Sequence, residues 1–411
     1  MNRTARLVVG FINQGVVSLG SLLVLIFAAR GYSSSTLGVF TIGAATYQVI
    51  VVVSRSLTGE ALLVLKPGSE VEESRLRRNC LSYAVTVPLG LGIVGAVGCS
   101  LFSGAAQAVA AALAVSPALI VQDTLRHVLL REKRLLASCA ADCIVVGSQV
   151  AIVAYGAAQG FDPWLLLILL GAPAAVVGYG RAFFSGAGFS IRESRDWRRS
   201  SRYLSGGLVF EATLGALVQW LTLMSVAHFG SLAEAAAFRA VMSIYGATNL
   251  VTSYLRSHYL AQLVEHGLSS VRDIWKSVLE MVALSFATVF GMYFALMVLP
   301  DSVGVELLGE TWIAAAPLFA LGAINRFCAA STTIPAVLLR ALQAPWRAAK
   351  TRVVLGMLNI VAAPIAIAFG GARLGFVVLS VMSVLMTVLL LRICRQEFVK
   401  VDAEGEETRI G

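Results

Sequence analysis

Six polar or charged side chains lie inside long apolar segments, where few such groups are tolerated. They are Arg55, Glu60, Glu211, Gln219, Asn325 and Arg326. An ionisable group near the middle of a bilayer costs about 2.5–3.5 kcal/mol on insertion scales, so each one requires a reason. Arginines in a water-filled cavity could hold an anion, and carboxylates there could carry a proton. We therefore treat these six residues as candidates for a substrate cavity.

Their spacing predicts which candidates share a helix face. Arg55 and Glu60 are five residues apart, about 140° around an α-helix, so we do not expect them to be close neighbours. Glu211 and Gln219 are eight residues apart, just over two turns, so we expect both to point the same way.

A structural alternative stands beside the functional interpretation. In the functional interpretation, Arg55 and Arg326 meet an anionic substrate in a cavity. In the alternative, the same side chains reach the membrane interface or pair in a static helix contact. For Glu211, a structural role in capping or helix pairing and a role in proton coupling are both open.

The elements that must position these residues are membrane-spanning helices. Of the 411 residues, 58% are hydrophobic and 13% are charged, and the mean hydropathy is +0.81. A soluble chain would carry about a quarter charged residues. The composition thus excludes soluble and disordered classes and predicts an all-α polytopic membrane protein. Twelve spans are expected, at 8–29, 38–65, 80–101, 106–124, 142–160, 164–184, 205–228, 236–261, 278–300, 312–338, 353–370 and 374–393.

The net charge of +9 records orientation and does not indicate a nucleic-acid partner. Basic residues cluster at the N-terminus, in alternate loops and in the C-terminal tail. The opposite side is expected to hold only Arg30, Arg239 and Arg373, while Arg55 and Arg326 lie inside spans. By the positive-inside rule, both termini and the long basic loops, including the stretch RHVLLREKR, are cytoplasmic.

The chain also repeats itself, which predicts two halves. FAARGYSSSTLGVFTIGAATYQ matches SVAHFGSLAEAAAFRAVMSIYG, pairing Ser33 with Ser231, and VLLR recurs in the same order further along. Six spans per half give parallel repeats with a cavity between them. The expected domains are a six-helix bundle at 1–200, a second at 201–394 and a polar cytoplasmic tail at 395–411.

We expect neither an enzyme nor a bound cofactor. No GxxxxGK[ST] loop is present, and the six cysteines form no Cys-x-x-Cys pair, so no metal site is expected. No catalytic residues are assigned. Coupling of transport to H⁺ or Na⁺ is left open.

Four segments resemble those of the polysaccharide-biosynthesis and O-antigen-type flippases of the multidrug/oligosaccharidyl-lipid/polysaccharide (MOP, MATE-like) superfamily. They are FAARGYSSSTLGVFTIGAA, QDTLRHVLLREKRLLASCAADCIVVGSQ, GSLAEAAAFRAVMSIYGATNLV and ELLGETWIAAAPLF. In the second, the matching positions are Gln122, Arg126, Arg131, Asp142 and Gln149.

The resemblance implies a flippase that translocates a lipid-linked oligosaccharide or polysaccharide precursor across the bacterial inner membrane by alternating access. Its partners would be the bilayer, a polyprenyl-diphosphate-linked glycan and polysaccharide-assembly proteins, with no nucleic acid. Arg55 and Arg326 would hold the diphosphate. The alternative of the same fold is a cation-coupled multidrug or metabolite antiporter, which the absence of acidic residues from the first span and from the last three disfavours. A third hypothesis is a non-transporting scaffold that docks partners on its basic loops.

Overall fold

The described part of the chain is entirely helical. The computed structural model describes residues 3–65, 69–248, 251–252, 271–341 and 345–410, and no strand occurs in these ranges. Nine helical stretches among them are long and apolar enough to cross a membrane. The predicted all-α polytopic fold is confirmed.

The first half of the chain forms one group of helices, which we call the N-half. Its elements are α1 (Arg3–Gly31), α2 (Ser34–Arg55), the π-helix η1 (Ser56–Glu60), α3 (Ala61–Val64), α4 (Glu70–Thr86), α5 (Leu89–Leu101), α6 (Gly104–Arg131), α7 (Leu135–Ala158) and α8 (Pro163–Phe184). The long helix α9 (Ile191–Ser225) then leads to the second group. The domain boundary proposed at 200/201 falls inside this helix.

The second group, the C-half, follows α9. Its elements are the π-helix η2 (Val226–Gly230), α10 (Leu232–Gly246), α12 (Val271–Val298), α13 (Asp301–Leu308), α14 (Thr311–Ala315), the 3₁₀-helix η3 (Ala316–Leu318), α15 (Phe319–Ser331), α16 (Thr333–Ala341) and α17 (Pro345–Ile410).

The nine stretches are consistent with twelve spans. The stretch Ala349–Glu397 lies within α17, whose backbone breaks at Gly370 and Gly371, so it contains two of the expected spans. Gly371 has a φ of +59°, which a residue with a side chain rarely adopts. α1 supplies a shorter apolar segment, Gly15–Gly31, and α10 covers the first part of the span expected at 236–261.

The predicted internal repeat coincides with matching local structure. Ser33 caps the start of α2 by accepting a hydrogen bond from the backbone N–H of Thr36 at 3.3 Å. Ser231 caps the start of α10 by accepting one from the N–H of Glu234 at 3.0 Å. The paired serines therefore perform the same capping role in α2 and in α10.

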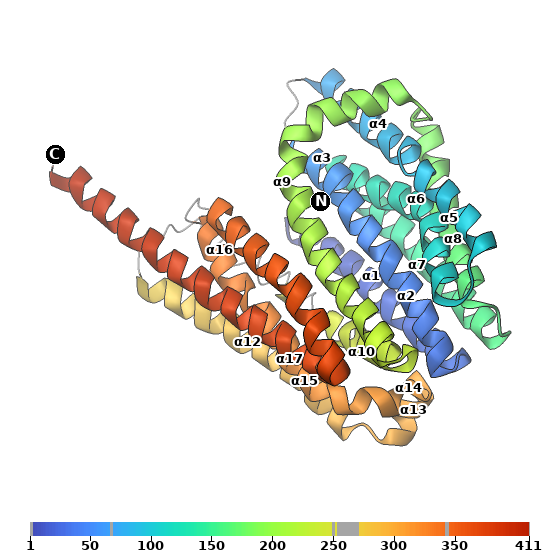
Figure 1. Cartoon of the computed structure of the whole chain (residues 1–411). Coiled ribbons are helices and arrows are strands. Elements are labelled where there is room, and N and C mark those ends of the chain that lie inside the picture. Colours follow the sequence, from blue (N-terminus) through green and yellow to red (C-terminus); the bar gives the residue numbers. More distant parts are fainter. Residues whose placement is uncertain (1–2, 66–68, 249–250, 253–270, 342–344, 411) are drawn as a thin grey trace.

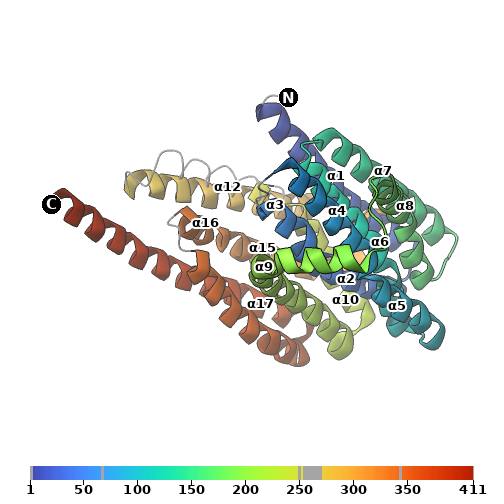
Figure 2. The same ribbon diagram turned by 90° about the horizontal axis from the view of Figure 1, so that it is seen from above.

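The two halves meet at one end of the molecule and diverge at the other (Figure 1). α10, α13 and α14 lie at the end where the halves meet; there α2 contacts α10, and α1 contacts α10 and α13. Both termini lie toward the other end, as an even number of spans requires. Viewed from that end, α12, α15, α16 and α17 lie to one side of the N-half (Figure 2). A central space open toward the termini is the expected consequence of this arrangement.

Candidate functional site

Two adjoining cavities, of about 790 and 780 Å³, occupy the space between the halves. Both are lined by residues of α1, α2, α9, α10 and α17, among them Val17, Gln48, Gln219, Arg239 and Leu379. Because they share these walls, we treat them as one central cavity. Its N-side compartment extends toward α6 and α7, and its C-side compartment extends toward α15 and the first part of α17.

The C-side compartment is strongly basic. Arg239, Arg326 and Arg352 line it, and no carboxylate does so among the lining residues that are described. The Nε of Arg326 donates to the hydroxyl of Thr248 at 3.0 Å. Asn325, on the preceding position of α15, is buried at the same wall. Three guanidinium groups around one aqueous space favour an anionic occupant.

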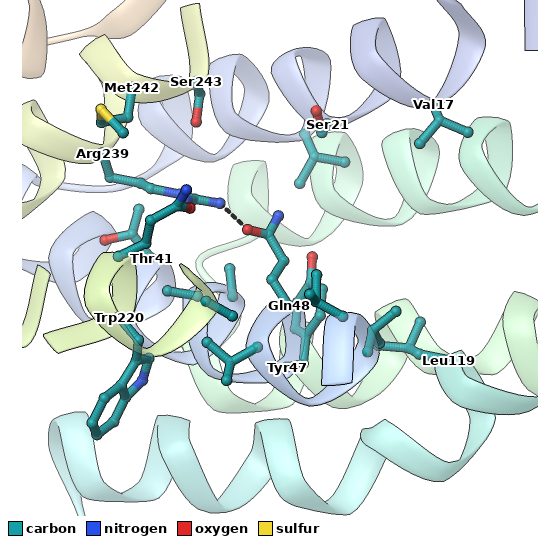
Figure 3. Close-up of a pocket in the computed structure, with 18 of the residues that line it drawn as sticks. Val17, Ser21, Thr41, Tyr47, Gln48, Leu119, Trp220, Arg239, Met242 and Ser243 are labelled. Atoms are coloured by element: carbon teal, nitrogen blue, oxygen red, sulfur yellow. Dashed lines mark hydrogen bonds between the residues drawn. The ribbon is translucent and has the colours of Figure 1, made fainter. Parts of the chain in front are cut away.

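Arg239 links the two halves across the cavity. It extends from α10 and donates a hydrogen bond to the side-chain oxygen of Gln48 on α2, as Figure 3 shows. The sequence places Arg239 on the outer side of the membrane, and this stays a prediction. α10 begins at Leu232, so Arg239 stands two turns inside the helix and lines both compartments.

The N-side compartment holds paired charges. Arg55 donates three hydrogen bonds to Asp123, from Nε at 3.2 and 3.0 Å and from Nη2 at 2.7 Å. Arg126 forms an ion pair with Asp142 at 3.2 Å, and Gln122 donates to the same carboxylate at 2.7 Å. Each of these two aspartates thus faces an arginine, and their charges balance locally.

Arg55 and Glu60, which α-helical spacing predicts are not close neighbours, both line the N-side compartment. The backbone between them is the π-helix η1, which begins directly after Arg55. A π-helix bonds residue i to i+5 and has more residues per turn than an α-helix, so the α-helical angle between the two residues does not apply here. Glu60 accepts a hydrogen bond from the hydroxyl of Ser56 at 3.0 Å.

Five of the six candidate residues line the central cavity. Gln219 lines both compartments, together with Gly215 on the same face of α9. Glu211 belongs to that helix by its backbone, but its side chain lies outside the described residues. The function of the six residues stays a prediction, and for Arg55 the pairing with Asp123 supports the structural alternative.

Sequence reasoning missed Asp123 and misplaced His127. The stretch RHVLLREKR was expected to be a cytoplasmic loop, but α6 continues to Arg131. His127 is 9% exposed, and its Nδ1 lies 2.7 Å from the carbonyl oxygen of Asp123. The pattern Asp123, Arg126, His127 has i, i+3, i+4 spacing, and this signal favours a helix over a loop.

Comparison with known proteins identifies the fold. No protein-family profile and no curated protein matches the chain. A MATE family multidrug resistance transporter of the MOP superfamily, in its inward-facing conformation, aligns with a TM-score of 0.69 at 12% identity, over 94% of this chain and 95% of that one. The chain has the MATE transporter fold.

Two further solved structures of this fold align with the chain over nearly its whole length. The MATE multidrug transporter DinF-BH, in complex with R6G, aligns with a TM-score of 0.65 at 12% identity, over 95% of this chain and 94% of that one. A MOP superfamily transporter from Pyrococcus furiosus, described as having a binding pocket of reverse polarity, aligns at 0.61 and 11% identity, over 97% and 96% of the two chains. At such low identity the similarity shows the fold alone, and the chain's activity must be argued from its cavity.

Proposed function

We propose that this protein is a membrane transporter that moves a lipid-linked oligosaccharide precursor across the bacterial inner membrane by alternating access. The observation that carries the proposal is the C-side compartment with Arg239, Arg326 and Arg352. A diphosphate linking a sugar to a lipid is a compact anion of high charge. Guanidinium groups recognise such anions through paired N–H donors.

The charge distribution supports an anionic head group at the C-side compartment. On the N-side, Arg55 pairs with Asp123 and Arg126 pairs with Asp142, so the positive charges of these two arginines are largely neutralised by the aspartates. Arg239 bonds to the neutral amide of Gln48, which leaves its positive charge in place. Arg239 and Arg352 line both compartments and Arg326 lines the C-side compartment alone, so a phosphate in the C-side compartment would meet all three arginines.

The open end supports loading from the cytoplasm. The chain aligns better with the inward-facing MATE transporter, at a TM-score of 0.69, than with an outward-facing one, at 0.58. The halves diverge at the end that carries both termini, which the distribution of basic loops assigns to the cytoplasm (Figure 1).

Replacing Arg326 or Arg239 separately with glutamine is expected to lower translocation about tenfold to a hundredfold. A hydrogen bond to a charged group is worth about 1.5–3 kcal/mol, and glutamine keeps the polarity while removing the charge. The measurement is the amount of lipid-linked glycan that reaches the outer leaflet in cells with the variant as sole copy. Arg392→Gln, at an exposed position outside the cavity, is the matched control. Unchanged translocation in both cavity variants would overturn the assignment.

The alternative is a cation-coupled multidrug or metabolite antiporter. The similar structures described as multidrug transporters favour it, and so do Glu60, Asp123 and Asp142 in the N-side compartment. It predicts ion-gradient-dependent efflux of a cationic dye from proteoliposomes. The flippase proposal predicts no such efflux.

A further inference from the structure

The first part of α9, residues 191–202, forms a basic helix at the surface. It runs across the end of the N-half beside α4 before α9 turns into the bundle (Figures 1 and 2). We call it the basic helix. Five of its residues are exposed arginines, namely Arg192, Arg195, Arg198, Arg199 and Arg202. None of the five forms an ion pair with a described carboxylate, so their charge is available to a partner.

The inner face of the basic helix is fixed to the N-half. Glu193 accepts a hydrogen bond from the hydroxyl of Ser82 at 2.5 Å. The hydroxyl of Ser194 donates one to the carbonyl oxygen of Ser82 at 3.2 Å. Trp197 is 1% exposed and donates from its indole N–H to the carbonyl of Leu57 at 3.1 Å. These contacts fix the inner face of the helix, while its five arginines remain exposed.

Large apolar side chains surround the start of the basic helix. Phe183, Phe184, Phe189 and Ile191 are 78%, 80%, 70% and 73% exposed. The helix continues into the apolar span Ala212–Gly230, which places its basic part at the boundary between bilayer and water. Exposed aromatic rings beside basic residues at that level are typical of a segment that lies in the membrane interface.

A third cavity, of about 410 Å³, lies under the basic helix. Its lining residues are Leu57, Tyr83, Arg198, Ser201 and Arg202. Arg198 and Arg202 are one helical turn apart and therefore project from the same side. Two guanidinium groups beside a hydroxyl group suit a phosphate group.

We propose that this cavity and the basic helix bind the phosphate head group of an anionic lipid in the leaflet at the terminus-bearing end. The apolar side chains at 183–191 distinguish a lipid from a free phosphate, because acyl chains would cover them. The basic face supplies the long-range attraction to an anionic surface. The proposal does not depend on which substrate the central cavity carries.

The lipid site adjoins the central cavity through one short segment. Leu57 lies in η1, between Arg55 and Glu60, both of which line the N-side compartment. Trp197 bonds to the carbonyl of Leu57 from the lipid-facing side. The proposed lipid site and the wall of the N-side compartment therefore share the segment η1.

The test measures lipid retention by the purified full-length protein. We expect native mass spectrometry to show phosphatidylglycerol retained in preference to phosphatidylcholine. Arg198→Gln combined with Arg202→Gln is expected to weaken phosphatidylglycerol binding about thirtyfold, since each basic residue near an anionic surface contributes a factor of about five. Arg198→Lys with Arg202→Lys keeps the charge and should retain most of the binding.

A matched control distinguishes loss of this site from loss of two positive charges elsewhere on the protein. Arg392→Gln with Arg395→Gln removes the same charge from exposed positions of α17 and should leave lipid retention unchanged. Equal retention in the Arg198/Arg202 glutamine variant and the unsubstituted protein would overturn the proposal. Equal loss in the α17 control, or displacement of the lipid by inorganic phosphate at the same concentration, would also overturn it.

Discussion

Replacing Asp123 with alanine is expected to destabilise the protein by about 1.5–3 kcal/mol, the range for losing hydrogen bonds to a charged group. Asp123 is 6% exposed and accepts three hydrogen bonds from Arg55. Its removal leaves the Arg55 guanidinium, whose side chain is 35% exposed and lines the N-side compartment, without its carboxylate. The measurement is thermal or denaturant unfolding of the purified protein in one detergent.

Two companion variants test whether the loss of the Arg55–Asp123 pair causes the lower stability. Removing Arg55 and Asp123 together should cost less than the sum of the single changes, because no unpaired charge remains. Glu306→Ala removes the carboxylate 4.0 Å from Arg30 at an exposed site and should cost less than about 1 kcal/mol. A loss of under 1 kcal/mol in Asp123→Ala would contradict a stabilising role for the buried pair.

The fold could be predicted because bilayer crossing leaves a strong pattern in the sequence. Apolar runs near the length of a bilayer predict helices, since only helices or closed barrels satisfy the backbone there. The repeated sequence pairs Ser33 with Ser231, and both residues cap the start of a helix, so the repeat in sequence corresponds to a repeat in local structure. The break at Gly370 and Gly371 likewise falls between two expected spans.

The charge partners could not be predicted in the same way. The rule that assigns basic stretches to loops placed His127 outside the membrane helices, whereas α6 extends to Arg131. Asp123 pairs with Arg55 from a helix 68 positions further along, and one sequence gives no signal for such a contact. The cavity-facing position of Arg239 depends on where α10 begins, and span boundaries are uncertain by several residues.

The π-helix η1 is the clearest local departure from sequence expectation. Its residues, Ser56–Glu60, contain no proline, and a π-turn has no spacing rule that distinguishes it from an α-helix beforehand. Glu60, its last residue, lines the same compartment as Arg55. The polar chemistry of this wall thus depends on backbone geometry as much as on residue type.

Gly38→Ala is expected to separate the halves at the end where they meet. Gly38 is buried in α2, and a Cβ there would lie 2.2 Å from the carbonyl oxygen of Leu232 in α10 and 2.7 Å from its carbonyl carbon. Both are backbone atoms, so no side chain can rotate away, and α2 must move by about 1 Å to reach an ordinary C···O contact. Overpacking of this kind costs about 1–3 kcal/mol.

The same displacement weakens the polar contacts that join the halves further along α2. Trp220 donates to the hydroxyl of Thr46 at 2.9 Å, and Arg239 donates to Gln48. We therefore expect Gly38→Ala to lower the unfolding temperature and to lengthen the distance between spin labels at cysteines introduced at Ser35 and Ala233. Gly147→Ala is the matched control, since a Cβ there meets nothing within 4 Å and alanine favours a helix by up to about 1 kcal/mol. An unchanged label distance and unfolding temperature in Gly38→Ala would show that α2 and α10 are not held together by this backbone contact.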